Sequence, residues 1–550
     1  MRFSLSALAL LTLACAGPTA PPVSTHVEDW RDEVIYQIVV DRFANGDPSN
    51  DVVDGIGPEP DDLARFQGGD WQGIRDRLDY IEGLGVTTLW LSPPYRNVPR
   101  TEREDGYHGY WPADFVDANP RFGTIDDLRA LVRDAHDRGM LVILDVVPNH
   151  AGRVFTYDLD ADGEVDEVEV EPPFSDPPYD VPLLWSHRPT MLSPDGERFT
   201  LEAAHFHLHG ASSGEPFEKE QGDFPTGLRD LDTESEAVIA ALVETHARWV
   251  EVTDVDGFRI DAIPHAARPF WAAFCSRLRT RLAEAGKTRF FLLGEVFDAN
   301  PEALASYTGL DQLDGAFAFD LKRDLIERVL LEGAPPTVAR GSLETNRSVF
   351  PASPQPGGIE LDPWRARVAF ADNHDVFRLR GELNDPLAAH LALIAVLTVD
   401  AIPAVYYGTE QGLAGRVHHA SREPLWPTGY DETHPTYRFL QRLVAVRRRS
   451  RALRYGSLEV RYASASGGAD EDPGPDAGMI AWSREHDGER VLVVLNSALA
   501  SSEARIPTRF GAGTRLVDAL ESTTDAWVVE ADRSVVVRLP SRAGVLLEAR

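Results

Sequence analysis

Residues 125–147, which read IDDLRALVRDAHDRGMLVILDVV, decide the class of fold. Positions 125–138 repeat apolar residues at helical spacing, and positions 141–147 form a short run that is apolar apart from one Asp. The same order occurs upstream, where a helical pattern at 71–84 precedes an apolar run at 87–91. Helices that alternate with short apolar strands are typical of a parallel sheet whose strands are joined by crossover helices.

Apolar runs of this kind occur eight times along the chain. They are Val34–Val40, Thr87–Leu91, Leu141–Val147, Gly257–Asp261, Phe290–Gly294, Gly315–Phe319, Val368–Phe370 and Ala404–Tyr406. Eight strands in this alternation predict an α/β fold of the (β/α)8 or TIM-barrel type. The last barrel helix is expected at 436–449.

Changes in composition along the sequence predict the domain boundaries. The segment 151–229, after the third strand, is rich in Pro, Asp and Gly and lacks helical periodicity, so we expect an inserted B domain there. The barrel should therefore comprise residues 25–150 and 230–450. Residues 451–550 predict a C-terminal antiparallel β-sandwich domain. Its expected strands are 457–462, 479–484, 490–496, 515–518, 526–529 and 534–539.

Residues 1–24 have the layout of an export signal followed by a tether. One positive charge precedes an apolar run that is too short to span a bilayer. Thr12-Leu13-Ala14-Cys15 resembles a bacterial lipobox, in which the Cys becomes acylated, although Thr12 stands where Leu is usual. We therefore expect an exported protein that is either an outer-membrane lipoprotein or secreted or periplasmic. Contact with a membrane is expected only through this N-terminal lipid.

The balance of charge limits the kind of partner. The chain has 54 Lys and Arg against 88 Asp and Glu, a formal net charge of −34. Such a chain repels a phosphate backbone, which argues against nucleic acid as a partner. A neutral or cationic ligand is favoured, and a monomer is expected. The only cysteines are Cys15 and Cys275, so lipidation or removal of Cys15 leaves no pair for an intrachain disulfide.

Carboxylates stand at the ends of three predicted strands. Asp261 ends one strand and lies on the same face as Arg259. Glu295 directly follows the strand at 290–294, and Asp375 closely follows the strand at 368–370. The carboxyl ends of barrel strands form one mouth, where neighbouring carboxylates raise one another's pKa. Such a set suits retaining glycoside hydrolysis, with Arg259 expected to keep Asp261 ionised. A single acidic residue at a strand end is more often a solvated edge or a helix cap.

Four motifs occur in an order that resembles the conserved regions of the alpha-amylase family, glycoside hydrolase family 13. They are Asp145–His150, Gly257–Asp261, Leu293–Val296 and Phe370–Asp375. The resemblance implies that Asp261 is the nucleophile and Glu295 the general acid/base. It also implies that Asp375 holds two hydroxyls of a distorted sugar ring.

The resemblance also implies which residues contact the sugar. Residues 107–111, Tyr-His-Gly-Tyr-Trp, resemble the family's sugar platform, in which an aromatic ring stacks on a pyranose. The implied contacts are Arg259, His108, Tyr110, Trp111, His150 and His374. Taken alone, an aromatic cluster is more often part of the core.

Two candidate calcium sites rest on resemblance. The first is similar to a site of cyclodextrin glycosyltransferases and neopullulanase-like enzymes, and its hard oxygen donors suit Ca²⁺. Its residues are Asn45, Asp47, Asn50, Asp51, Gly68 and Asp70. An Asx-rich turn without metal is the alternative. The second resembles the site common in the family, between barrel and inserted domain, with Asn149, Asp230 and the His265 carbonyl as ligands.

A third candidate site follows from the sequence pattern alone. Residues 158–169, DLDADGEVDEVE, fit the EF-hand loop, with acids at positions 1, 3, 5, 9 and 12 and Gly at position 6. The expected ligands are Asp158, Asp160, Asp162, Glu164 and Glu169. The alternative is an acidic surface turn, because two prolines follow closely and exclude an EF-hand helix pair. One to three calcium ions are therefore expected.

The expected reaction is hydrolysis of internal α-1,4 bonds in starch, glycogen or maltodextrin. Pro264 stands where many family members carry a Lys that helps to bind an acceptor, and no further domain follows the β domain. Cyclomaltodextrinase or neopullulanase-like activity, or cyclodextrin glycosyltransferase activity, is the close alternative. A non-catalytic glucan-binding lipoprotein is the alternative of another class, and the intact carboxylate set argues against it.

Overall fold

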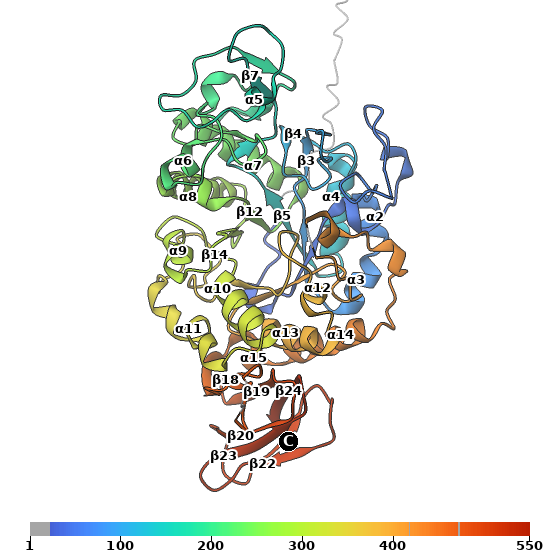
Figure 1. The fold of residues 1–550 in the computed structure, drawn as a ribbon, viewed down its shortest axis with the longest axis vertical. Coiled ribbons are helices and arrows are strands. Elements are labelled where there is room, and N and C mark those ends of the chain that lie inside the picture. The colour runs from blue at the N-terminus through green and yellow to red at the C-terminus, as the bar shows by residue number, and fades with distance from the viewer. Residues whose placement is uncertain (1–22, 417, 471–473) are drawn as a thin grey trace, which may run out of the picture.

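The computed structural model describes residues 23–416, 418–470 and 474–550, and it centres on an eight-stranded parallel barrel (Figure 1). Its strands are β1 (Ile35–Ile38), β2 (Thr88–Leu91), β5 (Leu141–Val146), β12 (Gly257–Ile260), β13 (Phe291–Gly294), β14 (Gly315–Ala316), β15 (Val368–Ala369) and β16 (Ile402–Tyr406). They pair in the order β14-β13-β12-β5-β2-β1-β16-β15, and a parallel bridge between Phe317 and Val368 closes the ring. The predicted barrel and all eight of its strands are confirmed. Residues 1–22 of the expected signal and tether, which was predicted at 1–24, lie outside the described residues.

Helices cover the outside of the barrel. They include α2 (Trp71–Asp76), α3 (Leu78–Leu84), α4 (Ile125–His136), α7 (Glu236–Thr253), α8 (Arg268–Glu284), α9 (Pro301–Ser306), α10 (Phe319–Leu321), α11 (Arg340–Leu343), α12 (Leu379–Leu383), α13 (Pro386–Thr398), α14 (Pro435–Arg449) and α15 (Arg451–Tyr455). A π-helix at Lys322–Leu331 continues α10. The single helix expected at 71–84 is two helices, because the backbone of Arg77 leaves the helical region (φ −113°, ψ 11°). Among the described residues, none of the helices is both long and apolar enough to cross a bilayer.

The inserted segment leaves and rejoins the barrel at one place. β6 (His150–Ala151) pairs with β11 (Arg229–Asp230), so both ends of the insertion are tied together. Between them lie two hairpins, two short α-helices and a 3-10 helix at Ala203–His205. The hairpins and α-helices are β7 (Phe155–Tyr157) with β8 (Leu183–Trp185), β9 (Thr190–Leu192) with β10 (Arg198–Thr200), α5 (Glu167–Val170) and α6 (Pro216–Gln221). The segment therefore projects from the carboxyl ends of the barrel strands (Figure 1). A third hairpin, β3 (Tyr95–Asn97) with β4 (Pro112–Ala118), follows β2 and carries the loop 98–111.

The C-terminal region is an antiparallel β-sandwich. One sheet has the order β17-β18-β19-β24-β21-β22, and the β20–β23 pair packs on it around buried residues such as Val494 and Val537. The strands are β17 (Ser457–Ala463), β18 (Met479–His486), β19 (Glu489–Asn496), β20 (Ser502–Pro507), β21 (Arg515–Asp518), β22 (Ala526–Val528), β23 (Ser534–Leu539) and β24 (Ala543–Ala549). The sequence analysis missed β20 and β24.

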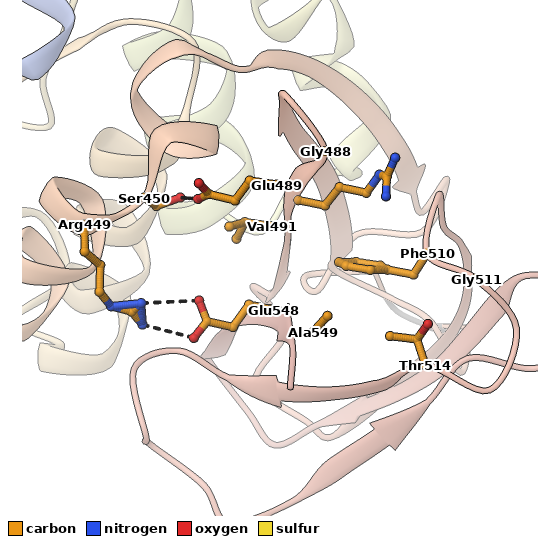
Figure 2. A pocket seen from close by; sticks show the side chains of 11 residues that line it. Arg449, Ser450, Gly488, Glu489, Val491, Phe510, Gly511, Thr514, Glu548 and Ala549 are labelled. Atoms are coloured by element: carbon orange, nitrogen blue, oxygen red, sulfur yellow. Dashed lines mark hydrogen bonds and ion pairs between the residues drawn. The ribbon is translucent and has the colours of Figure 1, made fainter.

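The β-sandwich is joined to the barrel by charged side chains. Arg484 of β18 is buried and donates hydrogen bonds to the carbonyls of Thr398 and Val399 at the end of α13. A cationic donor on the free carbonyls of a helix end stabilises that end. Nearby, Arg449 of α14 forms an ion pair with Glu548 at 3.1 Å beside a cavity of about 530 Å³ (Figure 2). The sandwich thus caps the helix that leads into β16.

Candidate active site

Four carboxylates surround one guanidinium at the mouth of the barrel. Arg259 of β12 is 1% exposed, and its Nη1 donates to Asp145 Oδ1 at 2.9 Å and to Asp261 Oδ1 at 2.7 Å. Its Nη2 lies 3.1 Å from Glu295 Oε1 and 3.9 Å from Asp375 Oδ2. The structure therefore brings together the three carboxylates that the sequence placed at separate strand ends.

The parallel register explains this convergence. Arg259 pairs with Asp145 on one neighbouring strand and with Leu293 on the other. Side chains two apart point to the same side of a strand, so Arg259 and Asp261 face the barrel interior together. After Asp261 the chain turns through Ala262, whose N–H donates to Glu295 Oε2 at 3.2 Å.

Asp375 is held by contacts in the loops that follow β15 and β16. Gln37 donates to His374 Nδ1 at 2.6 Å, so the His374 N–H is on Nε2, which lies 3.1 Å from Asp375 Oδ2. Arg422 donates to the His374 carbonyl at 2.9 Å and to Asp375 Oδ1 at 3.3 Å. Arg422, which is 6% exposed, is thus a second buried cation of this site.

Burial dominates the proton affinities of the set. It raises the pKa of Asp261 to about 7, aided by the nearby Glu295 and Asp375, and it also raises the pKa of Glu295. For Asp375 burial is outweighed by His374, Arg422 and Arg259, which lower its pKa. Arg259 lowers the pKa of Asp261, as expected, but it does not hold that pKa at its ordinary value. The Arg259 contact is present, but burial and two like charges outweigh it.

Aromatic rings of the loop 98–111 lie beside the carboxylates. Tyr110 donates its hydroxyl to Asp145 at 2.7 Å, and its ring lies parallel to that of His374 with centroids 5.1 Å apart. The His108 ring also stacks with that of Tyr110, with centroids 5.7 Å apart, and His108 Nδ1 accepts the Tyr110 N–H. Trp111 instead lines a cavity of about 460 Å³ between this loop and the inserted segment. The Trp111 ring meets the site through His108, which it contacts edge to face with centroids 4.8 Å apart.

His150 lies where the insertion starts. Its ring stacks on Phe224 of the insertion at 5.3 Å, and its Nε2 is 3.2 Å from the Tyr110 carbonyl. Burial lowers the pKa of His150 to about 4, so the ring is neutral at neutral pH. His150 therefore links the aromatic loop to the insertion.

The candidate ligands of the second calcium site also converge. The Asn149 amide nitrogen is 2.9 Å from Asp230 Oδ1 and 2.9 Å from the His265 carbonyl. With the Asn149 amide turned, its oxygen joins Asp230 Oδ1 and the His265 carbonyl, so three oxygens face one point. His207 competes for Asp230, because its Nδ1 lies 2.5 Å from Asp230 Oδ2 and acidic neighbours raise its pKa to about 11 against the effect of burial. The donor set fits Ca²⁺, with the His207 cation as a rival for Asp230.

A family model described as the alpha amylase catalytic domain matches residues 37–424. The chain belongs to the alpha-amylase family. It is 29% identical to the alpha-amylase of Streptomyces lividans, over 90% of this chain and 57% of that protein, so it spans little more than half of that relative. It matches a crystal structure of an Anoxybacillus alpha-amylase at 25% identity and a TM-score of 0.73, over 95% of this chain and 99% of that one. A cyclomaltodextrin glucanotransferase with a three-domain ABC distribution shares the fold at 24% identity and a TM-score of 0.74, over 94% of this chain and 99% of that one.

In this alpha-amylase family chain the first candidate calcium site forms one compact loop cluster. Asn45 donates to Asp51 Oδ1 at 2.8 Å, and Asp70 accepts the N–H of Asp47 at 2.8 Å. A Cβ on Gly68 (φ +97°) would lie 2.8 Å from Asp51 Oδ1, so the loop closes on this glycine. Asn50 Oδ1 is buried and has no hydrogen-bond partner among the residues that the structure describes. A buried oxygen acceptor with no donor fits a bound cation.

The EF-hand-like loop is only partly assembled as a ligand set. One carboxylate oxygen each from Asp158, Asp160 and Glu169 lie within 4.8 Å of one another. Glu169, which is 2% exposed, accepts the N–H of Leu159 at 2.6 Å and so folds the end of the loop onto its beginning. Asp162 and Glu164 are exposed and lie outside this group, which differs from the predicted ligand set. The loop places the carboxylates of positions 1, 3 and 12 together.

The sequence analysis missed three residues that shape the alpha-amylase family site. Asp145 is buried and accepts hydrogen bonds from Arg259, Tyr110 and Trp90. Its position in the first motif was a signal for it. Arg422 and Gln37, which hold Asp375 and His374, lie outside the four motifs, and the sequence carried no signal for them.

Proposed function

We propose that the chain is a retaining glycoside hydrolase that cleaves internal α-1,4 bonds of starch, glycogen or maltodextrin. The observation that carries this proposal is the contact of one buried guanidinium with carboxylates from separate strands. Retaining hydrolysis needs two carboxyl groups in two protonation states at one sugar. The pKa values of Asp261 and Glu295 are both raised, which supports one retained proton on this pair near neutral pH, whereas the pKa of Asp375 is lowered.

The proposed roles follow the geometry. The Asp261 carboxylate attacks the anomeric carbon, the glycosidic C–O bond breaks, and the Glu295 carboxyl gives its proton to the leaving oxygen. Glu295 then takes a proton from water, which attacks the same carbon and releases Asp261. Arg259 makes its shorter contact with Asp261, 2.7 Å against 3.1 Å to Glu295, which favours the shared proton on Glu295. Asp375 stays ionised and accepts hydrogen bonds from sugar hydroxyls.

The proposed sugar contacts are supported to different degrees. The Tyr110 ring lies at the carboxylates with its hydroxyl fixed by Asp145, which suits stacking on a pyranose. Arg259, His108, His150 and His374 surround the same position. We assign Trp111 to the adjoining cavity, where it would meet a neighbouring sugar unit.

Calcium binding is part of the proposal at all three candidate sites. The cluster around Asn50, the Asn149–Asp230–His265 group and the loop 158–169 each offer convergent oxygen donors. Ca²⁺ would neutralise these donors and stiffen the loops that border the mouth, and it takes no part in the chemical step.

The remaining assignments are proposals of the same kind. The β6–β11 pairing supports an inserted domain at 151–229, with a barrel of 25–150 and 230–450 and a β domain at 451–550. We also propose that residues 1–24 direct export, through lipidation of Cys15 or by secretion, and that the protein is a monomer. The number of domains does not separate hydrolysis from transfer, because a three-domain cyclomaltodextrin glucanotransferase shares this fold.

A product profile over time tests the proposal. The full chain with calcium is incubated with soluble starch, β-cyclodextrin and pullulan, and the anomer of the first product is read by NMR. Rapid loss of iodine staining with α-anomeric maltooligosaccharides supports the endo-hydrolase. Cyclic products, or preferential cleavage of cyclodextrin or pullulan, contradict it in favour of the close alternatives. Glu295→Gln should abolish turnover and keep oligosaccharide binding, and turnover near wild type would remove the assigned acid.

A further inference from the structure

Two histidines and a glutamate meet at the rim of the active site, outside the candidate calcium sites. Glu104 lies in the loop 98–111, while His418 and His419 lie in the loop after β16. One ligand atom of each side chain lies within 4.8 Å of the other two. Glu104 and His419 are partly buried, and His418 is exposed. The group therefore joins two loops and is open to solvent on one side.

We propose that Glu104, His418 and His419 bind a divalent transition-metal ion of the zinc class. Two imidazoles and one carboxylate are a ligand set that Zn²⁺ takes with an open fourth position, whereas Ca²⁺ prefers oxygen alone. Zinc bonds of about 2.1 Å in tetrahedral geometry put neighbouring ligand atoms about 3.4 Å apart. His419 Nε2 and Glu104 Oε2 are 3.1 Å apart, so these two ligands are already placed. Because the His418 side chain is exposed, it can rotate to bring its ring nitrogen to the ion as the third ligand.

A hydrogen bond behind the site holds His419 in the orientation that a ligand needs. Its Nδ1 lies 2.8 Å from the Tyr107 hydroxyl, which leaves Nε2 to face Glu104. Tyr107 is itself fixed, because the Arg42 guanidinium lies 3.7 Å from its ring centroid. A metal-binding histidine commonly uses its second nitrogen in this way, and that contact orients the ring. The net charge of −34 also raises the local concentration of cations around the chain.

The site is connected to the carboxylates through Arg422. This side chain donates to the Tyr107 hydroxyl at 3.3 Å and to Asp375 at 3.3 Å. A metal on Nε2 leaves the proton of His419 on Nδ1, so the N–H then donates to the Tyr107 oxygen. Tyr107 can no longer donate to His419, and the hydrogen bonding around Arg422 changes. We therefore expect zinc to lower glucan turnover. This consequence rests on the proposed function, whereas the zinc-binding proposal does not depend on it.

Calorimetric zinc titration of the calcium-saturated full chain tests the site. Wild type is compared with His418→Ala and Glu104→Gln, and with His486→Ala, which removes an exposed histidine beside Asp487 in the β-sandwich. We expect His418→Ala and Glu104→Gln to bind one zinc ion fewer per chain, or to bind that ion at least tenfold more weakly. The control His486→Ala should keep the zinc stoichiometry and affinity of wild type. Zinc bound by groups that all four proteins keep, such as His207, Asp232 and Glu234, cancels in the comparison.

The outcomes separate this proposal from the proposed function. Equal zinc stoichiometry and affinity in wild type, His418→Ala and Glu104→Gln would overturn the site. His418 is exposed, so its replacement leaves the fold intact. Zinc that inhibits wild type and not His418→Ala supports the connection to Asp375, and zinc bound here with unchanged turnover overturns that connection. If no protein turns over glucan, the proposed function fails and the binding comparison still decides the metal site.

Discussion

Replacing Asp145 by Asn tests whether the buried charge network positions the reacting groups. Asp145 is fully buried and accepts three hydrogen bonds, from Arg259 at 2.9 Å, Tyr110 at 2.7 Å and Trp90 at 3.1 Å. All three partners are donors. The Asn amide has only one acceptor oxygen, so its NH₂ group must face at least one donor, and Arg259 loses one of its counter-charges.

The expected losses can be estimated for stability and for turnover separately. Breaking a buried ion pair by removing one partner costs about 3–5 kcal/mol of the free energy of unfolding. Arg259 keeps its 2.7 Å contact with Asp261, so we expect the lower end, about 3 kcal/mol. A shift of about 1 Å in a positioning group costs roughly 100-fold in rate, which is about 2.7 kcal/mol of activation free energy. Asp145→Asn should therefore lower kcat/KM about 100-fold.

A matched control lies next to the same strand at its other end. Asp256 immediately precedes β12, is 1% exposed and pairs with Lys287 at 2.9 Å and His136 at 2.8 Å. Asp256→Asn should lower the thermal midpoint measured by circular dichroism, as Asp145→Asn does, with kcat/KM on maltooligosaccharide unchanged. If folded Asp145→Asn keeps kcat/KM within about threefold of wild type, or if both variants lose it equally, the reasoning is refuted.

The other predictions concern the second cation and calcium. Arg422→Gln removes a cation that lowers the pKa of Asp375, and coupled carboxylates titrate as a set, so the variant should raise the proton affinity of the set. The acid limb of the pH profile of kcat/KM should then move above its expected position near pH 7, and an unmoved limb would contradict this. Glu169→Gln should lower the calcium content measured by mass spectrometry by one ion, and Glu164→Gln should not, since Glu164 is exposed; equal contents would remove the loop site. Gly68→Ala should weaken calcium binding, whereas Gly55→Ala, also at positive φ but with no neighbour within 4 Å, should not; equal affinity in both would argue against the first site.

The barrel could be predicted from sequence because its strands are short, apolar and alternate with helices. The carboxyl ends of such strands meet at one mouth, so placing Asp261 and Glu295 at strand ends already brought them together. In the β-sandwich the same reasoning missed β20, which reads SEARIP and ends in Pro, and β24, the last strand of the chain. Within the described residues, β20 pairs with no strand other than β23, and its alternation of small and charged residues is weak evidence of a strand.

The contacts that tune the site could not be predicted because they join distant positions. Arg259 and Asp145 are 114 residues apart, and Arg422 and Asp375 are 47 apart. Periodicity tells which face a side chain takes, and it carries no information about which partner it meets there. The same limit explains why the pKa of Asp261 could not be predicted, since its largest cause, burial, cannot be measured from the order of the residues.

The distribution of charge at the mouth fits a neutral substrate whose transition state is positive. Four carboxylates face Arg259, and Arg422 adds a second cation at Asp375 only. The set therefore holds excess negative charge in a buried site, and burial, aided by the neighbouring carboxylates, raises the pKa values of Asp261 and Glu295. A glucan brings no charge to offset this excess when it binds. In the proposed reaction the oxocarbenium-like transition state carries positive charge, so the excess negative charge would stabilise that transition state more than the neutral bound sugar.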